Sequence, residues 1–269
     1  MSIWVHTIVK NEEKFIWYAI ASVVEYVDKI LVWDTGSSDA TTRIIETAGS
    51  IFEDKIEFRK LGEVSAEEMS SLRQDMLEKT SADWVINLDG DEVWWDDSIS
   101  SLTKLILEKG KKLESVVVKT VNPVGDIYHF LQESAGKYEI SGKKGHFNLR
   151  AFSTKTPGLN VSGVYPKEAY CDGSGKSLQE KNPYLLDVPY MHLTHLRRSS
   201  FGGNVLGRQH KFKYELGESF PLDYFFPEVF FRPTPPKVET PWDKISTKYL
   251  AKALLATPLK RLKRSLELL

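Results

Sequence analysis

The chain has 269 residues, of which 41% are hydrophobic and 27% are charged, and its formal net charge is −1. This length and composition suit one elaborated globular domain or two small ones. No apolar run approaches the roughly 18 residues that a membrane-spanning helix needs, and the start does not have the pattern of a signal peptide. The single cysteine, Cys171, excludes an internal disulfide and fits a reducing cytoplasm.

Predicted strands and helices alternate through the first 121 residues. Continuous apolar, β-rich runs predict strands at 3–9, 29–34, 55–61, 84–89 and 114–121. Helical spacing and capping residues predict helices at about 15–27, 39–48, 65–79 and 99–109, the third of which begins with a capping box at Ser65. Apolar strands separated by helices favour an α/β fold with a parallel sheet that is covered on both faces.

Short polar motifs follow three of these strands. "KNEE" (10–13) follows the first strand, "DTGSSD" (34–39) ends the second, and "DGDE" (89–92) ends the fourth. In parallel α/β sheets, ligands bind outside the carboxyl ends of the strands. The three motifs together therefore predict a ligand site at this edge of the sheet, more strongly than any one of them does.

Asp89 and Asp91 are separated only by Gly90, which lets the backbone turn sharply and a ligand approach. Two carboxylates this close raise each other's pKa, and a divalent cation removes the repulsion. Oxygen ligands suit Mg²⁺ or Mn²⁺, which complete their coordination with water and substrate phosphates. The alternatives are a solvated acidic turn and the nucleophile loop of haloacid-dehalogenase-like phosphatases, in which Asp89 would attack phosphorus.

Arg73 falls inside the apolar stripe of the third predicted helix, between Met69 and Leu77. An arginine on the buried side of a helix needs a carboxylate or phosphate partner. We therefore expect Arg73 to brace Asp89 or a bound diphosphate, with extension to the surface as the alternative.

Three segments, "IVKNEE", "VWDTGSSDATT" and "LRQDMLEKTSADWVINLDGDEVW", resemble in this order the family 2 glycosyltransferases of the GT-A fold. The match covers about the first 100 residues, and Gln74 departs from it because relatives often carry Asn there. The resemblance implies a GT-A Rossmann-like nucleotide-binding sheet with helices on both faces. It also implies a nucleotide-sugar donor, a metal ion that bridges the donor's diphosphate, and transfer to an acceptor.

The resemblance assigns donor-binding roles to residues of the first two motifs. Asn11 and Glu12 would lie at the nucleotide end of the donor, and Asp34 would accept a hydrogen bond from the base. Asp39 would help there, although it is equally suited to capping the following helix.

The metal site is expected to draw on both halves of the chain. By the same resemblance, Asp89 would face the ribose or a metal-bound water, and Asp91 would bind the metal. GT-A enzymes often complete the metal shell with a late histidine, which makes His192 or His195 the expected ligand and Arg197 the expected diphosphate contact. Histidines buried in the core are the alternative.

The segment "HFNLRAFSTKTPGLNVSGVYPKEAY" is similar to the Arg-Leu-Phe and Gly-x-x-His-Glu region of this group. Arg150 and Phe152 fit, and Glu168 stands at the glutamate, while residues 165–167 occupy the place where relatives often carry His. The resemblance implies that Glu168 is the general base, which takes the acceptor proton on the face opposite the leaving group and so inverts the anomeric centre. An exposed glutamate at a turn is the alternative.

The pattern changes after residue 121, and we divide the chain accordingly. Residues 1–121 would form the nucleotide-sugar-binding half and residues 122–219 an α+β acceptor-side half of the same domain, with a helix that ends at Gly217. Residues 220–269 would form an extended strap, rich in proline and aromatic residues as far as Trp242, and a C-terminal helix.

The C-terminal region is basic. Residues 244–269 contain seven Lys/Arg and one Glu, a charge of +6, which leaves −7 for the rest of the chain. Thr257 and Pro258 predict a helix start, followed by a leucine stripe at Leu259, Leu262, Leu266 and Leu269. A basic amphipathic helix suits either an anionic membrane surface or packing against protein.

These observations predict a metal-dependent, inverting glycosyltransferase of the hexosyltransferase type, with Mn²⁺ or Mg²⁺ as cofactor. It would move a sugar from a nucleotide-diphosphate sugar to a hydroxyl acceptor, such as a cell-surface glycan or a lipid-linked sugar, as in polysaccharide biosynthesis. We expect no nucleic-acid partner and a cytoplasmic location, peripheral on the inner face of the membrane if the helix binds there. A catalytically silent nucleotide-sugar-binding module is the alternative from another class.

Overall fold

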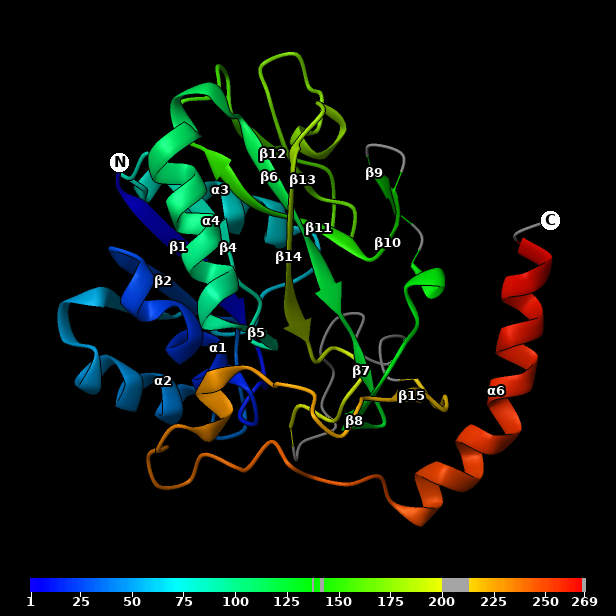
Figure 1. Cartoon of the computed structure of the whole chain (residues 1–269). Helices are drawn as coiled ribbons and strands as arrows, with labels where there is room; N and C mark the ends of the chain where they lie inside the picture. The colour runs from blue at the N-terminus through cyan, green and yellow to red at the C-terminus, as the bar shows by residue number, and fades with distance from the viewer. Residues whose placement is uncertain (137, 141–142, 200–212, 268–269) are drawn as a thin grey trace.

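The computed structural model describes residues 1–136, 138–140, 143–199 and 213–267. Its centre is an eight-stranded sheet with helices on both faces (Figure 1). In sheet order the strands are β3 (Ile56–Lys60), β2 (Lys29–Asp34), β1 (Ile3–Val9), β4 (Trp84–Asn87), β11 (Phe147–Ser153), β6 (Ser115–Val121), β14 (Tyr184–His192) and β5 (Glu92–Trp94).

The sheet has an apolar core on each face. The helices are α1 (Ile16–Val23), α2 (Thr41–Ile51), α3 (Glu68–Lys79), α4 (Asp96–Lys109) and α6 (Thr247–Glu267). Along β2, Ile30 and Val32 belong to the core that also contains α1, α2 and α4, whereas Leu31 and Trp33 pack with α3. Because alternate residues point to opposite buried faces, the strand reads as one continuous apolar run, which confirms the prediction of a two-sided sheet.

The sheet is mixed, which corrects the expectation of a parallel one. Strands β3, β2, β1 and β4 are parallel as predicted. Strand β11, from the second half of the chain, lies between β4 and β6 and runs antiparallel to both. The fifth predicted strand, β6, is therefore separated from the parallel series, although it pairs in parallel with β14.

Local signals fixed some element boundaries and missed others. The capping box forms: the Ser65 N–H donates to Glu68 Oε2 at 2.8 Å, and the Glu68 N–H donates to Ser65 Oγ at 3.3 Å. Helix α4 begins at Asp96, earlier than expected, and the sequence analysis missed β5 altogether. Residues 213–217 are not helical, contrary to the predicted helix, whose earlier part falls outside the described residues.

The second half adds small sheets around the central one. They pair β8 (Asp126–Phe130) with β7 (Pro123–Val124) and β15 (Glu218–Ser219), β9 (Tyr138–Ile140) with β10 (Lys143–Gly145), and β12 (Asn160–Ser162) with β13 (Ala169–Cys171). The strap at 220–242 has no strand or α-helix, but it is less extended than predicted, because it contains a 3₁₀ turn at Glu228–Phe231 and hydrogen-bonded turns at 222–223 and 236–237. Trp242 anchors its end, with ring centroids 6.2 Å from Tyr128 and 5.8 Å from Phe230.

Helix α6 begins ten residues before the predicted start, and Pro258 lies inside it. The Thr257 hydroxyl does not cap the helix: it donates to the Ala253 carbonyl at 2.6 Å and accepts from the Leu216 N–H at 2.8 Å. These two hydrogen bonds connect the turn before Pro258 to residue 216. Leu266 and Leu269 of the predicted stripe lie outside the described side chains. No helix in the described part of the chain has the length and apolarity needed to span a membrane.

A buried histidine in β1 makes stability depend on pH. Thr80 Oγ1 donates to the Met76 carbonyl at 2.8 Å, so it must accept from His6 Nε2–H at 2.7 Å. His6 Nδ1 is then unprotonated, and it has no hydrogen-bond partner among the described residues. Burial, with a smaller contribution from Arg73, lowers the pKa of His6 to about 3.

We predict that His6 weakens the fold in acid. Its folded pKa is depressed below the ordinary value near 6.5, so the unfolded chain takes up the proton first as the pH falls. Stability is then fully present above about pH 6.5 and declines toward pH 3. Urea unfolding between pH 7 and 4.5 should show that the free energy of unfolding falls more steeply for the wild type than for His6→Gln. The glutamine keeps a donor for Thr80 but does not titrate. Parallel curves for the two proteins would contradict this assignment.

Candidate functional site

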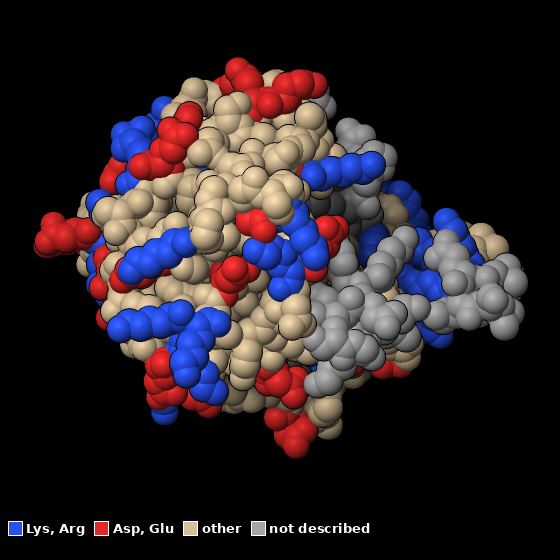
Figure 2. Space-filling model, turned by 90° about the horizontal axis from the view of Figure 1, so that it is seen from above, with Lys and Arg blue, Asp and Glu red and all other residues tan. Residues whose placement is uncertain are grey.

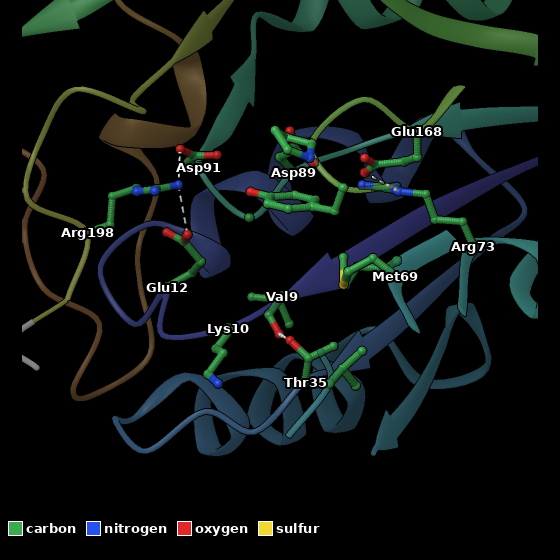
Figure 3. A pocket seen from close by; sticks show the side chains of 15 residues that line it. Val9, Lys10, Glu12, Thr35, Met69, Arg73, Asp89, Asp91, Glu168 and Arg198 are labelled. Carbon is green, nitrogen blue, oxygen red and sulfur yellow. Dashed lines mark hydrogen bonds and ion pairs between the residues drawn. The ribbon is translucent and has the colours of Figure 1, made fainter. Parts of the chain in front are cut away.

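A cavity of about 360 Å³ opens at the carboxyl ends of β1 and β4. Lys10 and Glu12 from the loop after β1, Thr35 after β2, and residues 89–91 after β4 all line it (Figure 3). The three polar motifs of the sequence therefore meet at one edge of the sheet, as the parallel order β2-β1-β4 requires.

The loop after β1 is fixed by the loop after β2. Asn11 adopts a φ of 53°, in the left-handed region that asparagine tolerates. Its side-chain Oδ1 accepts from the Ser38 N–H at 2.7 Å, and its own N–H donates to Ser37 Oγ at 2.8 Å. The Glu12 N–H donates to Thr41 Oγ1 at 2.7 Å. Asn11 thus connects the loop after β1 to the loop after β2, while the Glu12 side chain lines the cavity.

Asp34 has a carboxylate oxygen without a hydrogen-bond partner among the described residues, whereas the hydrogen bonds of Asp39 connect two segments. Oδ1 of Asp34 accepts two backbone N–H bonds from the turn at 36–37, at 3.1 and 3.0 Å. Its Oδ2 is buried and has no hydrogen-bond partner among the described residues, which costs free energy unless a ligand donates to it. Asp39 accepts from the Thr41 N–H at 2.9 Å, where α2 begins, and from Ser199 Oγ at 2.6 Å. Asp39 therefore joins the start of α2 to the segment after β14.

Asp89, Asp91 and His192 form a group that could hold a metal ion. One ligand atom from each lies within 4.8 Å of the others. The pairing of β14 with β5 places His192 opposite Glu92, and this brings the histidine beside the acidic turn. His195 is not in this group; it is buried, and its backbone pairs with Val124.

Glu92 and Arg150 form a buried ion pair beneath this group. The Arg150 guanidinium donates to Glu92 Oε2 at 2.7 Å and to the Asn87 carbonyl at 3.3 Å. Burial nevertheless raises the pKa of Glu92 to about 7, because Arg150 offsets only part of the desolvation cost and Asp89 and Asp91 oppose the charge. Burial would also raise the pKa of Asp89, but Arg150 and Arg73 hold it below its ordinary value.

The structure places Arg198, and not Arg197, in the cavity. Arg198 is buried and forms ion pairs with both Asp91 and Glu12, as Figure 3 shows. The predicted Arg197 is exposed, and its Nε donates to the Ser199 carbonyl at 3.2 Å. Neighbouring residues of an extended segment point to opposite sides, so a shift of one position exchanges the buried arginine for the exposed one.

Arg73 pairs with a carboxylate, as its place in the apolar stripe of α3 predicted, but the partner is Glu168 and not the expected Asp89. Its Nε donates to Glu168 Oε1 at 3.3 Å, and both side chains line the cavity (Figure 3). Glu168 precedes β13, and its side chain is only 9% exposed, which excludes the alternative of an exposed glutamate at a turn. Its Oε2 is buried and has no hydrogen-bond partner in the described part of the chain.

The burial of His192 bears on metal binding. Burial would lower the pKa of His192, but Asp91, Glu92 and Asp89 outweigh this effect and raise it. Its Nε2 lies 3.6 Å from Asp91 Oδ1. The surrounding carboxylates therefore favour a positive charge at this position, whether it is carried by a proton or by a cation.

The acidic groups outnumber the guanidinium groups around this site. Five carboxylates, those of Glu12, Asp89, Asp91, Glu92 and Glu168, lie with three guanidinium groups, those of Arg73, Arg150 and Arg198. With His192 neutral and Lys10, which also lines the cavity, included, the formal charge is 4 − 5 = −1. This surplus and the mixed oxygen and nitrogen donors fit a divalent cation.

Comparison with known proteins identifies a family model and a curated protein that match this chain. The family model described as "Glycosyl transferase family 2" matches residues 4–163, more than half of the chain. A TPR repeat-containing protein of Synechococcus elongatus is 32% identical over 108 residues, which make up 40% of this chain and 22% of that protein. The chain thus spans about a fifth of this curated relative.

A solved structure shares the fold. TarS 1–349 of S. aureus, in complex with UDP-GlcNAc, superposes with a TM-score of 0.50 at 15% identity, covering 76% of this chain and 62% of that one. Glucosyl-3-phosphoglycerate synthase from Mycobacterium tuberculosis, in complex with Mn²⁺, UDP and glucosyl-3-phosphoglycerate, aligns less closely, with a TM-score of 0.42 at 18% identity and 71% coverage of each chain. The architecture is the α/β GT-A Rossmann-like one that the motifs predicted.

We predict that the Glu92–Arg150 pair is needed for folding stability. Arg150→Met would leave a carboxylate that is 0% exposed without its cation, a change that costs about 3 kcal/mol or more. Urea denaturation at pH 8, where Glu92 would be charged, should show this loss. The matched change Arg43→Met, on the exposed face of α2, should stay within about 0.5 kcal/mol of the wild type. Equal stability of the two variants would contradict the prediction.

Proposed function

Because the chain belongs to glycosyl transferase family 2, we propose that it transfers a sugar from a nucleoside-diphosphate sugar to a hydroxyl acceptor with the help of Mn²⁺ or Mg²⁺. The observation that carries the metal-dependent part is the group of Asp89, Asp91 and His192 at the end of β4, beside the cavity. The family assignment argues against the phosphatase alternative. A silent nucleotide-sugar-binding module has the same fold and is distinguished by the experiment below.

We place the nucleotide end of the donor at the first two motifs. The free Oδ2 of Asp34 suits an imide N–H of a base, and Thr35 brings the same strand end into the cavity. Asn11, Glu12 and Asp39 would act mainly by shaping the loops around the nucleotide, since their hydrogen bonds connect the loop after β1 to the loop after β2 and to the start of α2.

The diphosphate would lie between the metal group and the arginine beside it. Asp89, Asp91 and His192 would hold the cation, which neutralises the charge on the leaving diphosphate when it is bound. Arg198 is the residue of this chain that we assign to the diphosphate, in place of the exposed Arg197. Its guanidinium already lies between two carboxylates, Asp91 and Glu12, and could exchange one of them for a phosphate oxygen.

Glu168 remains our candidate for the general base. Its Oε1 is held by Arg73 at 3.3 Å, while its buried Oε2 is left to accept a proton from an acceptor hydroxyl. The acceptor hydroxyl would lose its proton to this base and attack the anomeric carbon from the face opposite the diphosphate, whose bond to that carbon breaks, so the configuration would be inverted. Arg73 would position this base, and it would also lie close enough to Asp89 to stabilise that carboxylate.

We predict that one variant loses metal-dependent donor binding and that another keeps this binding but loses transfer. With a panel of nucleoside-diphosphate sugars, calorimetry should show Mn²⁺-dependent binding to the wild type that Asp91→Asn loses. Glu168→Gln should keep the donor affinity within about threefold but lower the rate of transfer by about 100-fold or more. The exposed Asp223→Asn is the control and should match the wild type.

Several outcomes would contradict the proposal. Binding without transfer in the wild type would favour the silent module, and binding that is independent of metal would remove the role of Asp91. If transfer occurs, nuclear magnetic resonance of the product should show the anomeric configuration opposite to that of the donor. Retention would exclude Glu168 as a simple general base.

We also propose that α6 carries the protein to an anionic membrane surface, where a lipid-linked acceptor would lie and the protein would be peripheral and cytoplasmic. Leu255 and Leu259 are 79% and 70% exposed, with Lys252 and Arg261 on the same helix. Basic side chains gather at the edge of the molecule in Figure 2 where Figure 1 places α6. Basic residues near such a surface contribute about 1 kcal/mol each.

We predict that α6 binds anionic vesicles. The wild type should cosediment with vesicles of phosphatidylcholine and phosphatidylglycerol but not with phosphatidylcholine alone. The double change Leu255→Asp and Leu259→Asp should weaken cosedimentation by about tenfold or more, since it removes apolar area and adds negative charge. Leu222→Asp, at a fully exposed leucine of the strap, should have no such effect. A wild type that ignores both kinds of vesicle would refute this role.

A further inference from the structure

A second, smaller cavity adjoins the first. Its volume is about 170 Å³, and it shares three lining residues, Arg73, Asp89 and Glu168, with the larger cavity. The Arg73–Glu168 ion pair therefore stands in the wall between the two spaces. A ligand in the small cavity and a ligand in the large one would both reach the Glu168 carboxylate.

The charged groups of the small cavity balance. Arg73 and Arg150 contribute two positive charges, and Asp89 and Glu168 contribute two negative ones. The large cavity, which is bordered by Asp91 and Glu12 as well, is the acidic one. The small cavity is therefore poorly suited to a phosphate or to a free cation, and it suits a neutral ligand that hydrogen-bonds to both kinds of charge.

The remaining lining is rich in uncharged hydrogen-bonding groups. Asn148 from β11, Tyr170 from β13, and Ser177 and Gln179 around the 3₁₀ turn Leu178–Glu180 contribute amides and hydroxyls. The Asn148 amide donates to the Tyr190 hydroxyl at 2.8 Å, and the Tyr170 hydroxyl donates to Asn87 Oδ1 at 3.2 Å. These bonds fix the side chains in place before any ligand arrives.

Two buried polar atoms in the lining residues lack partners. Glu168 Oε2 and Arg150 Nε are inaccessible to solvent, and neither has a hydrogen-bond partner among the described residues. Glu168 Oε2 is an acceptor and Arg150 Nε–H is a donor. A ligand that carries hydroxyl groups offers a partner of each kind once these two side chains turn toward the cavity, because each hydroxyl donates one hydrogen bond and accepts others.

We propose that the small cavity binds a sugar ring, and that Asn148 and Gln179 select which sugar it is. The proposal rests on the proposed function, since it adds the sugar to the nucleotide and metal sites placed above. A single hexose-sized ring is neutral, carries several hydroxyls, and matches a space of this size. The ring belongs either to the donor or to the acceptor, and both would place a hydroxyl or an anomeric carbon beside Glu168.

Calorimetry with paired ligands tests this assignment. For each nucleoside diphosphate that binds the wild type with Mn²⁺, its affinity is compared with the affinities of the corresponding sugar nucleotides. The same pairs of ligands are measured with Gln179→Ala, Asn148→Ala and the control Glu180→Ala. Glu180 lies on the same turn as Gln179 but is exposed and does not line the cavity. Thermal unfolding checks that Asn148→Ala, which loses its bond to Tyr190, is still folded; Gln179→Ala provides the second, independent variant.

The two sources of the sugar give different results. If the ring is the donor's, both alanine variants should bind the sugar nucleotide about tenfold more weakly and the plain nucleoside diphosphate unchanged. If it is the acceptor's, donor affinity should be unchanged, and saturation-transfer resonance with methyl glycosides, in the presence of nucleoside diphosphate and Mn²⁺, should show contacts that both variants lose. Glu180→Ala should behave as the wild type in either arm.

The failure of this proposal is distinct from that of the function. If nucleoside diphosphates bind but the two variants match the wild type in both arms, the small cavity is not a sugar site. The same conclusion follows if the variants weaken the plain nucleoside diphosphate as much as the sugar nucleotide. If no nucleotide binds the wild type at all, the proposed function itself is overturned, and this assignment with it.

Discussion

The structure depends on the burial of several carboxylates at the end of one strand. Asp89, Asp91 and Glu92 lie within a four-residue stretch just after β4, and Glu12 and Glu168 approach them from other segments. In a site of low solvent access, such a group is stable only where cations or protons neutralise it. The protein uses both means, since three arginines enter the cluster and the pKa of Glu92 is raised to about 7. The negative charge that is left supports our proposal of a divalent cation at this site.

The arginines that serve this cluster also assemble the domain. Arg73 comes from α3, Arg150 from β11, and Arg198 from the segment after β14. Each pairs with a carboxylate that is distant in sequence, so α3, β11 and the segment after β14 are all anchored to the acidic edge. These pairs position groups for chemistry and specify where the later segments dock, although a buried ion pair need not add net stability over apolar packing.

Sequence patterns predicted what is local or periodic. The two-sided strands, the capping box at Ser65 and the buried course of Arg73 each follow from residues on a single element. The insertion of β11 between β4 and β6 could not be predicted in this way, because strand order depends on pairings between distant segments. The strand β5 is only three residues long and exists through its pairing with β14. Arg198 was missed because a choice between adjacent arginines requires the register of an irregular segment.

The start of α6 was missed for a related reason. Thr257 and Pro258 are a strong local signal for a helix N-terminus, but the Thr257 hydroxyl is engaged by Leu216 and by the preceding turn of the same helix. Residues 213–216 hydrogen-bond to the helix. The two terminal guanidinium nitrogens of Arg264 donate to the Glu215 carboxylate at 2.6 and 2.7 Å. Tertiary hydrogen bonds thus override a capping signal, and they orient the helix so that Leu255 and Leu259 face away from the body.

Glu168 is the point at which these separate features meet. It lines both cavities, it is held by an arginine from α3, and one of its oxygens is buried without a partner. A general base must contact the acceptor hydroxyl and still lie near the anomeric carbon, so a carboxylate in the wall between two spaces satisfies both geometric demands at once. Because Arg73 binds one oxygen, the other is the only one that can turn toward a hydroxyl without breaking the ion pair. In the role that we propose for Glu168, the pair that completes the wall would determine which of its oxygens takes the proton.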